Sequence, residues 1–220
     1  GNSPMQTISS ITKLHKILTA ARRKGKSIGF VPTMGALHEG HGALLRRARK
    51  ENDLVVLSIF VNPKQFGKNE DFAKYPREKN KDCLFAKKEN VDIIFYPSVK
   101  KIYPRSFLTS IKISGITESL CGRFRPGHFN GVALVVAKLL NIVTPDVMYL
   151  GQKDAQQCVV IKRMVEDLNI PVKVKIGPTV REKDGLAMSS RNKYLTPQQR
   201  HEAPVLYKAL THARAVIRQG

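Results

Sequence analysis

Residues 27–41 read SIGFVPTMGALHEGH. The first six are mostly apolar and predict a short strand that breaks at residues 33–35. His38, Gly40 and His41 follow at the expected start of a helix. At a turn from a strand into a helix, backbone amides and the helix N-terminus face whatever binds there, and glycine lets the backbone come close to a ligand. The stretch therefore predicts an anion site.

The two histidines of this stretch flank a glycine. Such a pair can donate hydrogen bonds to a phosphoryl group as its charge redistributes. A lone HxxH pair is more often a coincidence or a metal site, but here it lies at a strand-to-helix turn, with a glycine that does not suit a rigid metal-binding helix. We therefore favour the phosphate interpretation.

Beyond this stretch, apolar strands alternate with amphipathic helices. Such alternation implies right-handed crossovers and a parallel sheet with helices on both faces, a doubly wound, Rossmann-like α/β fold. Ligands of these folds bind at the carboxyl ends of the strands, near a topological switch point. The predicted strands are 27–32, 54–61, 92–96, 147–150 and 172–176, and the predicted helices include 10–24, 77–90, 129–143 and 154–168.

The pattern changes after Gly177. Residues 181–196 are polar and rich in turn residues, and Thr196-Pro197 then predicts a helix to the end of the chain. One helix after a linker cannot bury its own apolar face. We therefore expect one α/β domain over residues 1–182 and the beginning of a second, small domain over residues 183–220.

The composition is that of an ordinary globular protein, with 42% apolar and 25% charged residues in a chain of 220. No apolar run approaches the ~20 residues of a membrane helix, so no membrane partner is expected. Cys83, Cys121 and Cys158 lie far apart without a CxxC pair, and we expect each to be a small buried side chain. This cysteine usage predicts a cytoplasmic protein with neither a disulfide framework nor a metal held by protein ligands.

The net charge is +21, from 38 Lys and Arg against 17 Asp and Glu. Such an excess raises the expectation of a polyanionic partner, either nucleic acid or a phosphate-bearing ligand. The basic residues are scattered in short groups, such as Arg46-Arg47 and Lys100-Lys101, rather than gathered in one tail. Charge alone does not decide between a nucleic-acid surface and general solubility.

Four further segments carry polar side chains beside predicted elements. Gln65, after the second strand, offers a donor and an acceptor to a small polar substrate, although spacing alone favours a solvent-exposed loop glutamine. Lys153 and Asp154, after the fourth strand, suit a phosphate and a helix start, and equally fit a capping aspartate beside a surface lysine.

Residues 188–191, MSSR, place two hydroxyls and a guanidinium on a loop that can close over a polyphosphate, a weak signal on its own. Loop 121–131 is rich in glycine and basic residues, and it fits a functional loop and a structural turn with surface arginines equally well.

The order of these motifs resembles the pantoate–β-alanine ligase family, part of the nucleotidylyltransferase superfamily with HxGH-type and KMSKS-type signatures. The similarity runs from about Ile8 to the last helix, and it rests on the ordered set because HxGH alone is weak. The stretches that carry it are PTMGALHEGH (32–41), SIFVNPKQFGKNEDFAKYPR (58–77), RPGHFNGV (125–132), GQKDAQQ (151–157) and VREKDGLAMSSRNKYL (180–195).

The resemblance implies a ligation in two steps. ATP and pantoate give pantoyl adenylate and pyrophosphate, and the amine of β-alanine then attacks the acyl carbon, which yields pantothenate and AMP. It also implies Mg²⁺ carried on the triphosphate, small-molecule substrates as partners, and a homodimer. By the resemblance, residues 1–182 are the nucleotide-binding, catalytic domain, and residues 183–220 are the beginning of a truncated C-terminal lid domain.

The resemblance further assigns site residues by motif position. His41 is expected to act as proton donor, His38 to assist with the phosphates, and Lys153 to complete the catalytic set, while Gln65 and Gln157 are expected to bind pantoate or β-alanine. The expected ATP contacts are Met34, Gly35, Ala36, Leu37, His38, Glu39, Gly40, His41, Gly151, Gln152, Lys153, Asp154, Val180, Met188, Ser189, Ser190 and Arg191.

The sequence departs from the family pattern at a few positions. Lys64 stands where the family usually has threonine, Gly42 replaces a bulky apolar residue, and family members continue beyond the position of Gly220.

Two other functions are alternatives to this ligation. Another nucleotidylyltransferase, joining AMP or CMP to a phosphorylated acceptor, leaves Gln65 and Gln157 unexplained. A nucleic-acid-binding module is disfavoured because the sequence has no Trp, no aromatic RNA-binding motif and no basic stripe. No nucleic-acid partner is therefore expected.

Overall fold

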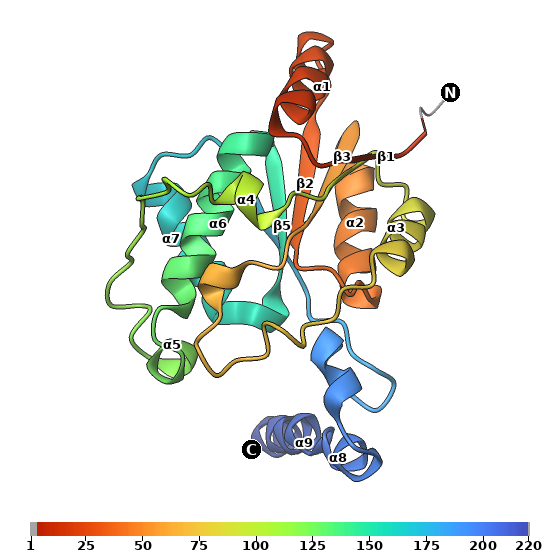
Figure 1. The fold of residues 1–220 in the computed structure, drawn as a ribbon. Helices are drawn as coiled ribbons and strands as arrows, with labels where there is room; N and C mark the ends of the chain where they lie inside the picture. Colours follow the sequence, from red (N-terminus) through yellow and green to blue (C-terminus); the bar gives the residue numbers. More distant parts are fainter. Residues whose placement is uncertain (1–3, 220) are drawn as a thin grey trace.

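The fold is built on one parallel β-sheet of six strands (Figure 1). The computed structural model describes residues 4–219. Every neighbouring pair of strands is parallel, which confirms the predicted α/β fold. The strands lie in the order β1 (Gln6–Ile8), β4 (Ile93–Phe95), β3 (Leu54–Ile59), β2 (Ile28–Thr33), β5 (Val147–Gly151) and β6 (Lys173–Gly177).

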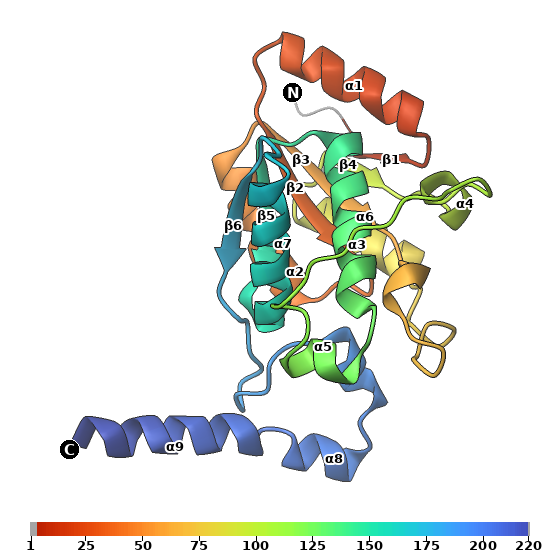
Figure 2. The same cartoon turned by 90° about the vertical axis from the view of Figure 1, so that its left-hand side faces the viewer.

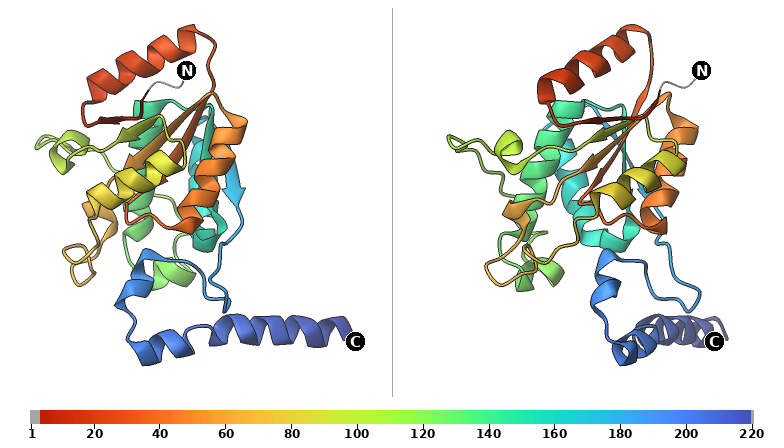
Figure 3. Two further views of the ribbon diagram at one scale, coloured as in Figure 1. Left: turned by 90° about the vertical axis from the view of Figure 1, so that its right-hand side faces the viewer. Right: turned by 45° about the vertical axis from the view of Figure 1, so that its right-hand side comes forward.

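Helices cover both faces of the sheet. Successive side chains of a strand point to opposite faces, so Val56 lies in one hydrophobic core while Val55 and Leu57 lie in the other. Because both faces are covered, the whole of β3 is apolar apart from Ser58. Helices α1 (Ile11–Arg23), α6 (His128–Val143) and α7 (Ala155–Asp167) pack on one face, and α2 (Glu39–Glu51) and α3 (Lys79–Lys88), side by side in Figure 3, pack on the other.

The strand order places a topological switch point between β2 and β5. The chain adds β3 and β4 on one side of β2, then crosses back to add β5 and β6 on the other side. Ligands of doubly wound sheets bind at the carboxyl ends of the two strands at this point. Residues 34–41 follow β2 and residues 152–157 follow β5, so the fold brings two of the predicted motifs together.

The predicted strands and the helices that connect them are present, with ends shifted by one or two residues. The sequence analysis missed β1, α4 (Val99–Ile102) and α5 (Leu120–Phe124), because segments of three to five residues are too short to establish a period. It also missed three short 3₁₀ helices that carry polar residues of the site. These are η1 (Pro63–Gln65), η2 (Gln152–Asp154) and η3 (Ser190–Tyr194).

The C-terminal helix is not continuous, contrary to the prediction. Helix α8 (Pro197–Glu202) ends before Pro204 and α9 (Val205–Gln219) begins after it, because proline lacks the N–H that a helix interior needs. Figure 2 shows α8 and α9 beyond the carboxyl ends of the strands, with α9 extending away from the sheet. No residue of α9 is buried within the part of the chain that the structure describes.

The three cysteines are free, and they differ in burial. Cys158 is buried as expected, Cys83 is half-buried, and the expectation for Cys121 was wrong because it lies exposed on the short helix α5. Across residues 4–219, no helix has the length and apolar character to cross a bilayer.

Candidate active site

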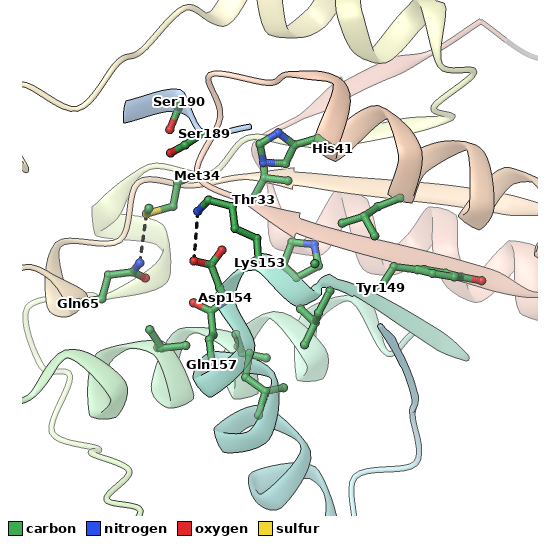
Figure 4. Close-up of a pocket in the computed structure, with 18 of the residues that line it drawn as sticks. Thr33, Met34, His41, Gln65, Tyr149, Lys153, Asp154, Gln157, Ser189 and Ser190 are labelled. Carbon is green, nitrogen blue, oxygen red and sulfur yellow. Dashed lines mark hydrogen bonds and ion pairs between the residues drawn. The ribbon is translucent and has the colours of Figure 1, made fainter. Parts of the chain in front are cut away.

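A cavity of about 240 Å³ lies at the carboxyl ends of the strands and brings most of the predicted motif residues together (Figure 4). Side chains from α6 and the strands give it an apolar wall that includes Phe60, Val132 and Leu139. The predicted residues that line it are Met34, His38, Gly40, His41, Gln65, Gly151, Lys153, Asp154, Gln157, Val180, Met188, Ser189, Ser190 and Arg191. Five predicted contacts, Gly35, Ala36, Leu37, Glu39 and Gln152, are not among its lining residues.

The two histidines of the HxGH motif cap helix α2 with their own rings. Nδ1 of His38 accepts a hydrogen bond from the amide of Gly40 at 3.1 Å, and Nδ1 of His41 accepts one from the amide of His38 at 3.2 Å. An imidazole nitrogen that accepts a hydrogen bond carries no proton, so in each neutral ring the proton lies on Nε2. Both rings are therefore hydrogen-bond donors through Nε2.

Burial keeps these histidines neutral. Burial, together with smaller contributions from the nearby His38 and Lys153, lowers the pKa of His41 to about 3. Burial also lowers the pKa of His38, again with a contribution from Lys153. His41 therefore donates a hydrogen bond near neutral pH without carrying the positive charge of an imidazolium.

An internal carboxylate occupies part of the predicted anion site. Asp82, which is 3% exposed, accepts hydrogen bonds from the amides of Ala36 at 3.0 Å and Leu37 at 2.8 Å. Burial raises the pKa of this carboxyl group. The amides expected to face a ligand at these positions are thus used inside the protein, and they fix the turn in which Gly35 and Ala36 have positive φ angles.

Glu39 also has an internal partner. Its carboxylate pairs with Arg46, which forms a second ion pair with Glu89 at 2.8 Å. The side chain of Glu39 is therefore engaged outside the cavity.

Gln65 is buried rather than exposed on a loop, which contradicts the expectation from spacing alone. It ends η1 and is 8% exposed. Its Oε1 accepts from Nδ2 of Asn62 at 3.0 Å, and its amide nitrogen lies 3.2 Å from Sδ of Met34, a weak acceptor. Because Asn62 holds the oxygen, the NH₂ group of Gln65 is left to donate to a substrate. Sequence analysis missed Asn62, although it directly precedes Pro63 at the end of the second strand segment.

Lys153 and Asp154 form an ion pair beside the histidines. Their side chains are 3.3 Å apart, and both line the cavity (Figure 4). The side chain of Asp154 makes no capping hydrogen bond to α7, so the interpretation as a simple capping residue is wrong. Gln157, one turn into α7, lines the same wall.

The MSSR segment forms the opposite wall. The hydroxyl of Ser189 caps η3, and Oγ of Ser190 lies 3.2 Å from the hydroxyl of Tyr75. Arg191 forms a bidentate salt bridge with Asp71, with N···O distances of 2.9 and 2.8 Å. Sequence analysis did not single out Tyr75 or Asp71, and both lie in the SIFVNPKQFGKNEDFAKYPR stretch that carries the resemblance.

The basic loop before α6 also reaches the cavity, which favours the site over a turn with surface arginines. Arg125 and His128 both line it. Nδ1 of His128 donates to the carbonyl of Gln65 at 2.8 Å, and Nε2 accepts from Arg125 at 3.2 Å. Burial lowers the pKa of His128. This ring therefore supports the backbone that carries Gln65.

Known proteins of one family match this chain over nearly its whole length. The family model described as pantoate-beta-alanine ligase matches residues 6–219. The pantothenate synthetase of Caldicellulosiruptor bescii is 55% identical over 216 residues, which cover 98% of this chain and 77% of that protein. The chain belongs to the pantoate–β-alanine ligase family. It is an ATP-dependent ligase of pantothenate biosynthesis that forms the carbon–nitrogen bond between pantoate and β-alanine.

Solved structures of pantoate–β-alanine ligases have the same fold. The pantothenate synthetase of Thermus thermophilus superposes with a TM-score of 0.93 at 50% identity, over 98% of this chain and 77% of that one. The ligase of Francisella tularensis, described as complexed with β,γ-ATP and β-alanine, gives a TM-score of 0.89 at 44% identity, over 94% and 79% of the two chains.

The structure accounts for two departures of this ligase from the family pattern. The ammonium group of Lys64 lies over the rings of Tyr103 at 5.3 Å and Phe107 at 5.7 Å, and Lys64 does not line the cavity. A Cβ atom at Gly42 would lie 3.1 Å from the ring of Phe85 and 3.1 Å from the guanidinium of Arg46. Lys64 is therefore separate from the substrate side of η1, and Gly42 allows α2 and α3 to approach closely.

Among the residues that the structure describes, no group of three or more His, Cys, Asp and Glu side chains could hold a metal ion.

Proposed function

We propose that the cavity adenylates pantoate and then transfers the pantoyl group to β-alanine. The observation that carries this proposal is the convergence on one cavity of neutral Nε2–H donors (His38 and His41), an ammonium (Lys153) and a guanidinium (Arg191), opposite an apolar wall. A carboxylate is a poor electrophile until its oxygen becomes part of a good leaving group, and a cluster of positive and hydrogen-bond-donating groups stabilises the charge of departing pyrophosphate.

The nucleotide half of the site consists of the motifs at the switch point and on η3. Lys153 and Arg191 neutralise phosphate charge, while His38 and His41 donate hydrogen bonds that strengthen in the transition state. Mg²⁺ enters with the nucleotide, as MgATP. Val180 is assigned to the adenine side, and Gly40, Gly151, Asp154, Met188, Ser189 and Ser190 complete the proposed ATP contacts.

The acid half of the site consists of two glutamines and the apolar wall. Gln65 presents its NH₂ group because Asn62 holds its oxygen, and Gln157 faces the same space from α7. These amides suit the carboxylate and hydroxyls of pantoate. The apolar side chains of α6 suit the branched carbon skeleton of pantoate. An acyl adenylate enclosed in this cavity is shielded from water.

In the second step, the amine nitrogen of β-alanine attacks the acyl carbon of the adenylate. A carbon–nitrogen bond forms, the bond between the acyl carbon and the phosphate oxygen breaks, and AMP leaves with the electron pair. The amine loses a proton as the amide forms. Positioning is the main requirement, because holding two reactants together replaces a bimolecular step by an effectively unimolecular one.

We further propose that residues 183–220 belong to a lid-like domain, supported by the position of η3 in the cavity wall and of α8 beyond the strand ends (Figure 2). We also propose a homodimer, supported by large exposed side chains on and before α5, with Leu108 95%, Leu120 72% and Phe124 80% exposed. The three free thiols support a cytoplasmic location.

The test is AMP release from MgATP, with pantoate and β-alanine supplied singly and together. We expect AMP only when both are present, and pantoate-dependent exchange of labelled pyrophosphate into ATP without β-alanine. Exchange without AMP release would restrict the function of this chain to adenylation. Failure of both reactions by folded protein would contradict the proposal.

A further inference from the structure

Two arginines in the cavity wall are each held by a carboxylate from one short segment. Asp71 accepts from Nε and Nη2 of Arg191 at 2.9 and 2.8 Å, and the adjacent Glu70 accepts from Nε and Nη2 of Arg125 at 2.7 and 2.5 Å. A bidentate pair fixes the plane of a guanidinium as well as its position. The arginines come from η3 and from the loop before α6. The two adjacent acids therefore fix the positions of two elements that are distant in sequence.

The two arginines differ in how many of their N–H groups remain for a ligand. Arg125 also donates from Nη1 to Nε2 of His128 and from Nη2 to the carbonyl of Gln65, so its hydrogen bonds lie mostly within the protein. Within residues 4–219, the only hydrogen bonds of the Arg191 side chain are those to Asp71, and its Nη1 group has no protein partner. Arg191 can therefore meet a ligand with a complete NH₂ group, whereas Arg125 supports the protein.

The segment that carries Asp71 has its own internal support. The ring of Phe66 packs edge-on against Phe72 at 5.3 Å and against Tyr75 at 6.0 Å. Arg77 donates to the carbonyls of Phe72 at 3.0 Å and Tyr75 at 3.1 Å. The loop that carries Asp71 is therefore held in place by its own internal contacts.

Other contacts hold η3 against this segment independently of Asp71. Lys193 pairs with Glu78 at 2.6 Å, and the hydroxyl of Tyr194 donates to the carbonyl of Lys74 at 3.2 Å. Removal of the Asp71 charge should consequently free the guanidinium of Arg191 without detaching η3.

We propose that Asp71 is a positioning residue, which touches no substrate and acts by holding Arg191 with its free NH₂ group towards the phosphate chain in the cavity. The proposal rests on the proposed adenylation at this site. Coulomb's law alone predicts the opposite sign, because removing a carboxylate near a polyanion should favour anion binding. A loss of rate in an Asp71 variant therefore separates positioning from simple charge.

The test is pantoate-dependent exchange of labelled pyrophosphate into ATP, measured on the full chain. Asp71→Asn keeps the shape and removes the charge. We expect its exchange kcat to fall on the order of tenfold, the scale of immobilising one flexible side chain. The thermal midpoint should change little, because the side chains of Asp71 and Arg191 are 24% and 42% exposed and partly exposed pairs contribute little stability. Asp167→Asn is the matched control, since it removes the acid of an exposed aspartate–arginine pair at the end of α7, and its rate should stay within twofold.

A double-mutant cycle decides whether Asp71 acts through Arg191. We expect Asp71→Asn to cost nothing further in an Arg191→Ala background, because the residue that it positions is gone. Additive losses, or a rate in Asp71→Asn equal to or above wild type, would overturn the proposal. If Asp71→Asn does not fold, Asp71→Glu keeps the charge and displaces the carboxylate by one methylene; an unchanged exchange rate in that variant would equally overturn it. Absence of exchange by the folded wild-type chain would instead count against the proposed function.

Discussion

At the residue scale, the burial of the two HxGH histidines decides how they respond to pH. A pKa lowered from 6.5 to about 3 means that folded His41 is neutral throughout the range in which enzymes are usually assayed. An imidazolium acid would lose activity as pH rises through its pKa, whereas a neutral Nε2–H donor does not. We therefore expect kcat/KM for pyrophosphate exchange to show no decline between pH 6 and 8 that depends on His41.

The measurement is the pH profile of wild type beside that of His41→Gln, each corrected for the ionisation of the free substrates. The two profiles should be parallel over this range. A wild-type rate that falls tenfold per pH unit above pH 6.5, with a flat profile in the variant, would restore His41 as a charged acid.

A second prediction for His41 tests whether Nε2 is the ring nitrogen that donates the hydrogen bond. The amide nitrogen of glutamine reaches roughly the position of histidine Nε2, whereas asparagine reaches only that of Nδ1. We expect His41→Ala to lower the exchange kcat on the order of 10²-fold, the scale of losing a transition-state donor. His41→Gln should recover part of this loss and His41→Asn should not. Equal rates for glutamine and asparagine would contradict donation from Nε2, and near wild-type pyrophosphate release by His41→Ala would remove His41 from the mechanism.

At the scale of elements, periodicity was sufficient for the sheet and insufficient for the site. The alternation of apolar strands and helices predicts β2 to β6 and the helices between them because each element is long enough to display its period. Asp71 and Asp82 could not be predicted in their roles, because their partners lie 120 and 46 residues away in sequence. Asn62 lies only three residues from Gln65, but its Nδ2 also donates to the carbonyl of Gly131, 69 residues away, a contact that the sequence does not show. The family resemblance named the residues expected to touch substrate, and the fold was needed to find those that orient them.

The contact between α6 and η1 gives a prediction for a whole element. A Cβ atom at Gly131 would lie 2.1 Å from the carbonyl oxygen of Lys64 and 2.7 Å from the amide of Gln65. Since backbone atoms cannot move aside as a flexible side chain can, Gly131→Ala should push η1 away from α6. We expect a loss of about 1–3 kcal/mol in the free energy of unfolding and a raised KM for pantoate.

Urea unfolding and steady-state kinetics check this prediction. Gly67→Ala is the control from the same region, because its Cβ would come no closer than 3.7 Å to another atom and its φ angle is not positive. It should leave the KM for pantoate unchanged. If both variants behave alike, close packing at Gly131 is not what positions Gln65.

At the scale of the whole molecule, the net charge of +21 has two opposite consequences for salt dependence. Binding to nucleic acid releases counterions and weakens steeply as salt rises. Association of two chains of like charge is opposed by repulsion, and salt relieves that repulsion. The sign of the salt effect on complex formation therefore distinguishes a nucleic-acid surface from a dimer.

We expect the proposed homodimer to strengthen as salt rises from about 50 to 500 mM, which spans a large change in the Debye length. Sedimentation velocity over a dilution series measures it. Phe124→Asp should yield monomers, because an added charge in an apolar interface is left without a partner, whereas Leu168→Asp, which alters an exposed leucine at the end of α7, should not. A dimer that dissociates on adding salt would mean that charge pairs hold it together, and a monomer at all concentrations would leave the exposed side chains before and on α5 without this partner.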